Sequence, residues 1–233
     1  MKASVLIGTP THEEDKIFFE SYFNSIKNQD YPCKLIVADN SKSDDYSNEL
    51  KKKNIDVIKV SWIDSKYDRV LESRKEITKK FLEGDYTHLF WVDSDIILPK
   101  KAISVLLEAN KDIISGVYLS SFTYPQFKLI HPVAYKLTHD ENLRLPLQAG
   151  EIRINHVKEM HSVGFGCCLI KKEVAEKIRL RRIPNTSSTE DILFCSDARK
   201  NNYKTFIHAG VLCKHGHKMD DGIHYLDANN YIK

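Results

Sequence analysis

The chain has 233 residues, and its 42% hydrophobic and 29% charged residues are the composition of a globular protein with a sizeable core. The 35 Lys and Arg exceed the 32 Asp and Glu by only three, which is too small an excess to indicate nucleic-acid binding. No apolar run approaches the twenty residues of a membrane span, and the short apolar run near the N-terminus does not fit a signal peptide.

The five cysteines are an odd number and include no C-x-x-C pair. Cys167 and Cys168 are adjacent within an apolar run, which favours packed, reduced thiols over disulfides. We therefore expect a cytoplasmic protein, and a peripheral contact between a basic patch and a membrane remains open.

Strand-like and helix-like runs alternate through the first half of the chain. We expect strands at 4–8, 34–39, 55–62, 87–93 and 112–119, and helices at 15–29, 44–53, 67–85 and 99–110. Gly84 ends the third helix, and Pro99 begins the fourth. The expected inward side chains are Ile17, Phe18, Tyr22 and Ile26 on the first helix and Val70, Ile77 and Phe81 on the third. Such alternation predicts a parallel, helix-covered sheet, whose ligands gather at the carboxyl ends of the strands.

The second half of the chain is more irregular. Short strands are expected at 133–137 and 151–157, a strand interrupted by glycines at 162–170, and an extended segment at 204–218. Helices are expected at 171–180 and from Ser188 to about Asn201. Without a linker or an internal repeat, the sequence predicts one domain over 1–233. We divide it into a nucleotide-binding half (about 1–118) and an acceptor- and metal-binding half (about 119–233).

Two aspartates end the apolar run THLFWVDSDIILP, at residues 87–99. Asp93 and Asp95 are two positions apart on an extended segment, so their side chains point the same way. The chain has neither a P-loop nor a G-x-G-x-x-G turn to hold phosphates. A divalent cation held by the two carboxylates would take the place of those phosphate-binding motifs, since Mg²⁺ and Mn²⁺ bind jointly with substrate phosphates. The alternative is that the two acids form an Asx turn or cap the following helix.

Several segments together resemble the GT-A glycosyltransferases, specifically a family 2-like inverting class that uses nucleotide-sugar donors. In chain order they are SVLIGTPTHEE, IVADNSKSDD, SRKEITKKFLEGDYTHLFWVDSD, HSVGFGCCLIKKEV, TSSTEDILFCSDARKNNY and FIHAGVLCKHGHK. The resemblance extends from residue 3 to about residue 218. It implies an α/β GT-A fold, with a central, mostly parallel sheet and helices on both faces.

The resemblance also implies roles for single residues in the donor site. Nucleotide contacts would come from Thr9, Pro10, Asp39, Arg74 and Asp93. Lys75 departs from the asparagine that commonly follows this arginine. A Mn²⁺ or Mg²⁺ ion would be held by Asp93, Asp95 and a closing histidine, with His215 the better fit and His217 the alternate.

Further roles concern the sugar and the acceptor. Gly164, Gly166 and Glu190 would lie beside the donor or acceptor sugar, and Asp191 would be the catalytic base. The rival explanation for Asp191 is a helix cap, because Ser188 and Asp191 have capping-box spacing. Glu190 and Asp191 diverge by about 100° on a helix, so only one of them can face the site.

Two further patterns have a structural alternative. The aromatic side chains at 118–135 could stack on an acceptor sugar or could pack on one another. Cys213, His215 and His217 would share one face of an extended segment, as in a zinc site, but no second ligand pair accompanies them and zinc would leave Asp93 and Asp95 unexplained.

The leading hypothesis is an enzyme, a metal-dependent inverting glycosyltransferase that uses a UDP-sugar in preference to a GDP-sugar. Its acceptor, whether glycan, lipid-linked or protein, is open. One alternative is a nucleotidyltransferase, which would need a basic, glycine-rich loop where GTPTHEE is acidic. The other is a non-catalytic module that binds a nucleotide sugar or a carbohydrate.

Overall fold

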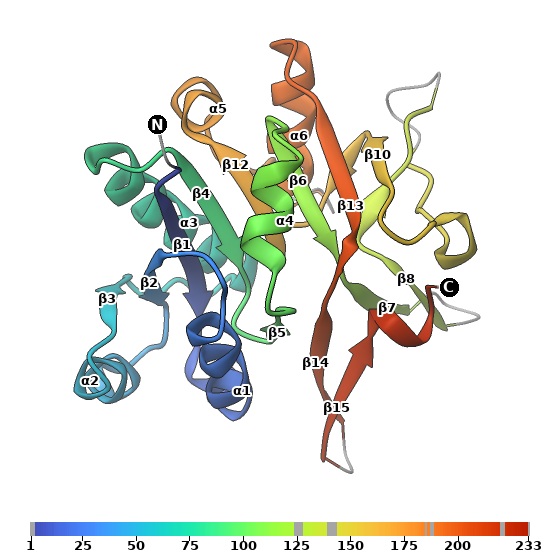
Figure 1. Ribbon diagram of the computed structural model, residues 1–233. Helices are drawn as coiled ribbons and strands as arrows, with labels where there is room; N and C mark the ends of the chain where they lie inside the picture. The colour runs from blue at the N-terminus through green and yellow to red at the C-terminus, as the bar shows by residue number, and fades with distance from the viewer. Residues whose placement is uncertain are drawn as a thin grey trace.

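The computed structural model describes residues 3–123, 128–138, 144–184, 186, 189–219 and 222–232, and an eight-stranded sheet forms its centre (Figure 1). Across the sheet the strands are β10 (Val157–Met160), β13 (Thr205–Leu212), β6 (Ile113–Val117), β12 (Cys167–Lys171), β4 (His88–Val92), β1 (Val5–Thr11), β2 (Cys33–Asp39) and β3 (Asp56–Lys59). The pairs β4–β1, β1–β2, β2–β3 and β13–β6 are parallel. β12 is antiparallel to both β4 and β6, and β10 is antiparallel to β13. The predicted mostly parallel sheet is confirmed.

Helices cover both faces of this sheet. One face packs against α1 (Lys16–Lys27), α2 (Asp45–Lys52) and α4 (Ala102–Glu108), and the other against α3 (Lys66–Glu83), α5 (Lys172–Lys177) and α6 (Glu190–Lys200). Successive residues of a strand point to opposite faces, so Leu89 and Trp91 of β4 join one core while Phe90 and Val92 join the other. This double burial is why β4 is apolar throughout.

Three smaller sheets extend the second half. β5 (Ile96–Ile97) pairs with β14 (Lys214–Met219), which pairs with β15 (Gly222–Asp227). β7 (Leu119–Thr123) pairs with β8 (Lys128–Pro132), and β9 (Ala134–Tyr135) pairs with β11 (Ser162–Val163). Short 3₁₀ turns lie at Glu13–Asp15, Ala149–Glu151 and Ala228–Asn230. β13 runs on into β14, which carries the C-terminal segment to the far end of β4 (Figure 1).

Some expected details are wrong. Ile17 is 42% exposed, because the buried stripe of α1 runs through Phe18, Tyr22 and Ile26 at intervals of four, one position away from Ile17. Val70 is only partly buried, and Leu71 packs inward in its place. The strand expected at 151–157 is a 3₁₀ turn followed by irregular chain, and β10 begins only at Val157. The strand expected at 162–170 is divided into β11 and β12.

Within the described ranges, no helix combines the length and the apolar character required to cross a lipid bilayer.

Candidate functional site

A cavity of about 170 Å³ opens at the carboxyl ends of β1, β2 and β4. The residues after β1, including His12 and Asp15, form one wall. The opposite wall is the first half of α3, which contributes Lys66, Arg69 and Arg74. Asp93, Ser94 and Asp95 close the cavity at the end of β4. The cavity therefore has acidic and basic walls facing each other.

Asp95 is paired with His215, because β14 lies beside β5 in the register that sets His215 opposite Ile96. The distance from Asp95 Oδ2 to His215 Nε2 is 3.3 Å, and the other ring nitrogen, Nδ1, donates to the Leu119 carbonyl at 2.7 Å. Burial disfavours charge on both groups, but their mutual attraction outweighs it. It lowers the pKa of Asp95 and raises the pKa of His215.

The Asp95–His215 pair fits a divalent cation. Asp95 Oδ1 is buried and has no hydrogen-bond partner. His215 donates its Nδ1 proton to the Leu119 carbonyl, as metal-binding histidines donate their second ring N–H, and this leaves Nε2 to bind an ion beside Asp95. Across the described part of the chain, no three His, Cys, Asp or Glu side chains converge as a metal cluster. The structure thus brings together two of the predicted ligands. The ring of His217, two residues farther along β14, has its centroid 4.5 Å from that of the His215 ring.

Arg74 is 4% exposed and links Asp93 to Glu190. Its Nη2 lies 2.8 Å from Asp93 Oδ1, and its Nε lies 3.1 Å from Glu190 Oε1. The guanidinium packs over the rings of Trp91 and Phe165, at 5.1 and 5.3 Å from their centroids. The sequence suggested no partnership between Arg74 and Glu190, since nothing local connects α3 to the start of α6.

Asp191 follows Glu190 in the first turn of α6, with partners of its own. Its Oδ1 accepts hydrogen bonds from the Thr189 hydroxyl and from the Ile192 N–H, the latter at 2.7 Å. The N-cap of α6 is Thr189, and Ser188 of the expected capping box lies outside the described residues. Glu190 faces Arg74, whereas Asp191 does not contact it, so the two acids diverge.

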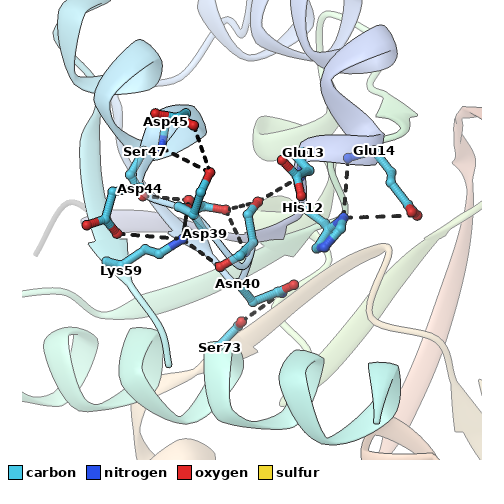
Figure 2. Close-up of polar contacts among 12 residues, drawn as sticks. His12, Glu13, Glu14, Asp39, Asn40, Asp44, Asp45, Ser47, Lys59 and Ser73 are labelled. Carbon is cyan, nitrogen blue, oxygen red and sulfur yellow. Dashed lines mark hydrogen bonds and ion pairs between the residues drawn. The ribbon is translucent and has the colours of Figure 1, made fainter. Parts of the chain in front are cut away.

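Asp39 is fully buried, and protein groups surround its carboxylate (Figure 2). Oδ1 accepts from the Ser41 N–H and hydroxyl, and Oδ2 accepts from the Ser47 hydroxyl and from Lys59 Nζ at 3.1 Å. It is the next residue, Asn40, whose side chain lines the cavity, and its Nδ2 donates to Ser73 at 3.1 Å. A base contact by Asp39 stays a prediction.

The remaining expected nucleotide contacts lie at the end of β1. Pro10 lines the cavity, whereas the Thr9 hydroxyl is buried against that of Tyr22.

Gly164 and Gly166 lie between β11 and β12, where Tyr118 packs against the backbone. A Cβ atom at residue 164 would meet the Tyr118 hydroxyl at 2.0 Å, and one at residue 166 would meet the phenol carbon Cζ at 2.7 Å. The phenol therefore explains both glycines without a sugar. Their predicted contact with the sugar is untested.

Of the described aromatic residues between 118 and 135, Phe122 and Tyr135 pack on His131, whereas Tyr118 packs against His215. Phe122 of β7 stacks on His131 of β8 with ring centroids 4.2 Å apart, and His131 lies edge-on to Tyr135. Residues 124–127, which include another two rings of this segment, are not among those described.

Sequence reasoning missed His12, Asp15, Lys66 and Arg69 as cavity residues. Burial, with the nearby charge of Asp95, raises the pKa of Asp15 to about 6, although the Ser94 hydroxyl donates to it at 3.1 Å. Lys66 and Arg74 are eight residues apart and so lie on one face of α3, a periodicity that could have identified Lys66. The sequence around Asp15 gives no sign of a cavity residue, because an acid at the start of a helix is common.

No family model matches the chain, and no curated protein sequence shows significant similarity to it. Solved structures do resemble it in fold. A197 from STIV matches with a TM-score of 0.50 at 15% identity, over 100% of this chain and 97% of that one. GalNAc-T7, crystallised with UDP, GalNAc and Mn²⁺, matches with a TM-score of 0.63 at 13% identity, over 91% of this chain and 43% of its own.

A third similar structure is residues 1–349 of S. aureus TarS in complex with UDP-GlcNAc. The TM-score is 0.53 at 19% identity, over 90% of this chain and 56% of that one. The chain thus spans under two thirds of the GalNAc-T7 and TarS structures. The sheet, its helices and these likenesses together show that the chain has the GT-A fold of nucleotide-diphospho-sugar glycosyltransferases.

Proposed function

We propose that this protein is a metal-dependent glycosyltransferase that moves a sugar from a nucleoside diphosphate sugar to a hydroxyl acceptor with inversion. The observation that carries the proposal is the Asp95–His215 pair, set at the end of β4 beside a cavity with a basic opposite wall. Ligands of α/β sheets bind at this edge. A donor diphosphate needs both positive charge and a cation there.

The carboxylate oxygen of Asp95 that has no partner and Nε2 of His215 would hold Mn²⁺ or Mg²⁺. Such an ion supplies Lewis-acid stabilisation of charge on the leaving diphosphate. Asp93 would act from its present position beside Arg74, contacting ribose or the ion. Substrate oxygens and water would complete the coordination, as is usual for Mg²⁺.

Lys66, Arg69 and Arg74 would attract and orient the diphosphate from the α3 side. Asp93 and Glu190 hold Arg74 in place on two sides. Fixed charges of this kind act without reorganisation when the leaving group departs.

Asp191 would take the proton from the acceptor hydroxyl. Its hydrogen bonds to Thr189 and Ile192 fix the carboxylate at the start of α6. A base opposite the leaving group leads to single displacement and therefore to inversion. Gly164, Gly166 and Glu190 would lie near the transferred sugar in this arrangement.

The donor would be a UDP-sugar in preference to a GDP-sugar. GalNAc-T7 was crystallised with UDP and TarS with UDP-GlcNAc, and these likenesses support a uridine nucleotide. Thr9, Pro10, Asp39 and Asn40 are the residues at the β1 and β2 ends that would surround it.

The test is to incubate the protein with a panel of UDP- and GDP-sugars, with and without Mn²⁺, and to measure release of nucleotide. We expect consumption of a UDP-sugar that EDTA abolishes and added Mn²⁺ restores. Metal-dependent binding of donors with no turnover on any acceptor would indicate a binding module. Formation of pyrophosphate from a nucleoside triphosphate and a sugar phosphate would indicate a nucleotidyltransferase. Either result would overturn the proposal.

A further inference from the structure

Tyr118 follows β6 and lies among the residues of the site, although the sequence analysis considers it only as one of the aromatic side chains at 118–135 and the proposed function gives it no role. It is 6% exposed. A phenol buried among charged groups acts through hydrogen bonds and packing.

The first contact of Tyr118 is with His215. The two rings meet edge to face, with centroids 5.6 Å apart and an interplanar angle of 89°. The carbonyl of the next residue, Leu119, accepts the Nδ1 proton of the same imidazole at 2.7 Å. Two consecutive residues therefore fix the plane and the tautomer of His215, which leaves Nε2 directed at Asp95.

The second contact of Tyr118 is with the segment that holds Asp93. The phenol oxygen accepts the N–H of Gly166 at 3.1 Å, and the carbonyl of Gly166 accepts the N–H of Asp93 at 3.2 Å. A continuous series of contacts thus runs from His215 through Tyr118 and Gly166 to the backbone of Asp93.

Gly164 leaves the space that the Tyr118 phenol occupies. A Cβ at residue 164 would lie 2.0 Å from the hydroxyl, whereas a Cβ at residue 166 would lie nearest to a ring carbon, at 2.7 Å. Removing only the hydroxyl would relieve the shortest contact at residue 164, where Val133 Cγ1 would still lie 2.7 Å from the Cβ, and would leave the shortest contact at residue 166 unchanged. The two glycines therefore give matched test positions.

We propose that Tyr118 is a positioning residue that sets His215 against Asp95 and holds the D-x-D segment in place through Gly166. This inference rests on the proposed function only in taking Asp95 and His215 as the metal ligands. Tyr118 touches neither the ion nor the substrate. It acts by orienting a ligand, as do the outer partners of other metal sites.

The binding test compares Tyr118→Phe, Tyr118→Leu and the control Tyr31→Phe by calorimetry with Mn²⁺ and UDP. Tyr31 donates to the Ala3 carbonyl near the amino ends of the strands, so its variant removes a hydroxyl far from the site. We expect Tyr118→Leu to weaken Mn²⁺ binding by about tenfold or more, the usual scale for outer partners of a ligand. Tyr118→Phe, which keeps the ring against His215, should lose clearly less Mn²⁺ affinity. Tyr31→Phe should bind as the wild type does.

The packing test uses unfolding measurements on Gly164→Ala, Gly166→Ala and each of these combined with Tyr118→Phe. Tyr118→Phe should restore clearly more of the stability lost by Gly164→Ala than of that lost by Gly166→Ala. If Tyr118→Phe restores the same stability in both glycine variants, the packing of the phenol against Gly164 is contradicted. Wild-type Mn²⁺ affinity in folded Tyr118→Leu would overturn the positioning role.

The failures of the two proposals remain distinguishable. If the wild type binds Mn²⁺ and UDP but transfers no sugar, the proposed function fails while both tests of Tyr118 can still be read. If Tyr118→Leu does not fold, the Mn²⁺ affinity of Tyr118→Phe and the stabilities of the glycine double variants test the positioning role instead. A loss of melting temperature at unchanged Mn²⁺ affinity would make Tyr118 a purely structural residue and contradict the proposal.

Discussion

The side chain of Glu190 lies 3.1 Å from the guanidinium of Arg74, and both are almost completely buried. This contact joins the start of α6 to the middle of α3, and through Arg74 it reaches Asp93. A buried charge without its partner is costly, so the three groups depend on one another.

Glu190→Ala should lower the free energy of unfolding by about 3 kcal/mol or more, because it leaves Arg74 partly unpaired in the interior. Urea denaturation measures the loss. The matched control is Glu83→Ala, which breaks an exposed pair with Lys80 on α3 and should cost at most about 1 kcal/mol. Similar losses in both variants would contradict the structural importance of the buried pair.

Asp95→Ala should abolish Mn²⁺-dependent binding of UDP, and it should also lower the melting temperature, because it removes the partner of the partly buried His215. Calorimetry with UDP and Mn²⁺ checks the binding. Asp44→Ala, at a side chain 76% exposed beside Lys59, serves as control and should bind normally. Unchanged UDP affinity in the Asp95 variant would show that the metal site is elsewhere.

Asp191→Asn retains the oxygen that accepts from Thr189 and Ile192, so its melting temperature should stay close to that of the wild type. Turnover should fall by roughly a hundredfold or more if this carboxylate is the base, while donor and Mn²⁺ binding persist. Steady-state kinetics and NMR of the product anomer provide the measurements. Thr189→Ala, which removes only the neighbouring hydroxyl, should retain most activity. Retention of the anomeric configuration in the product would exclude Asp191 as the base of a single displacement.

Asp39→Asn should destabilise the protein at neutral pH by about 2 kcal/mol, because an amide cannot accept from all the donors around this carboxylate. Burial alone would raise the pKa of Asp39, but the Ser41 and Ser47 hydrogen bonds outweigh it and lower the pKa. The stabilisation is therefore present above the unfolded-state pKa, about 4, and is lost as the pH falls through the folded-state value. Urea unfolding should show that the difference in free energy of unfolding between variant and wild type is smaller at pH 3 than at pH 7.

The same variant tests the expected base contact of Asp39. Ser47→Ala removes one of its donors and should reduce stability without changing UDP affinity. A loss of UDP affinity in Asp39→Asn alone would support a role with the nucleotide. Wild-type affinity in both variants would leave Asp39 as a structural residue.

Asp15→Asn should stabilise the metal-free protein at pH 7.5 by on the order of 1 to 2 kcal/mol. The folded-state pKa of Asp15, about 6, lies above the unfolded-state value near 4. Between these values the unfolded chain loses the proton while the folded protein keeps it, so wild-type stability falls as the pH rises through this window. Denaturation at pH 4 and at pH 7.5 should show the gain only at the higher pH. Glu14→Gln, at an exposed neighbour, should show no such pH dependence.

The sheet could be predicted because its strands carry strong local signals. Leu89 to Val92 are apolar in succession, which indicates burial on both faces, and glycine and proline mark the neighbouring turns. Asp93 and Asp95 could be picked out because they follow a buried strand in a sheet whose ligands bind at the carboxyl ends of its strands, whereas His215 was expected only from the family resemblance.

The rest of the site depends on contacts between distant segments. Nothing near Arg74 in the sequence indicates that Glu190 will pair with it, and nothing near Gly164 indicates that a phenol will occupy the adjacent space. Asp39 carries the expected motif, yet its partners Ser47 and Lys59 come from α2 and β3. The division of 162–170 into β11 and β12 also depends on a distant residue. Tyr118 packs against Gly166, between the two strands.

β12 lies between β4 and β6 and is antiparallel to both. Residues 1–118 therefore supply strands on either side of a gap that only a later segment can fill. During synthesis on the ribosome, β4 and β6 must wait for more than fifty further residues before their shared neighbour emerges. Until then each exposes an apolar strand edge that could pair with another chain. The order of chain synthesis thus makes the strands of residues 1–118 dependent on β12 for a continuous sheet.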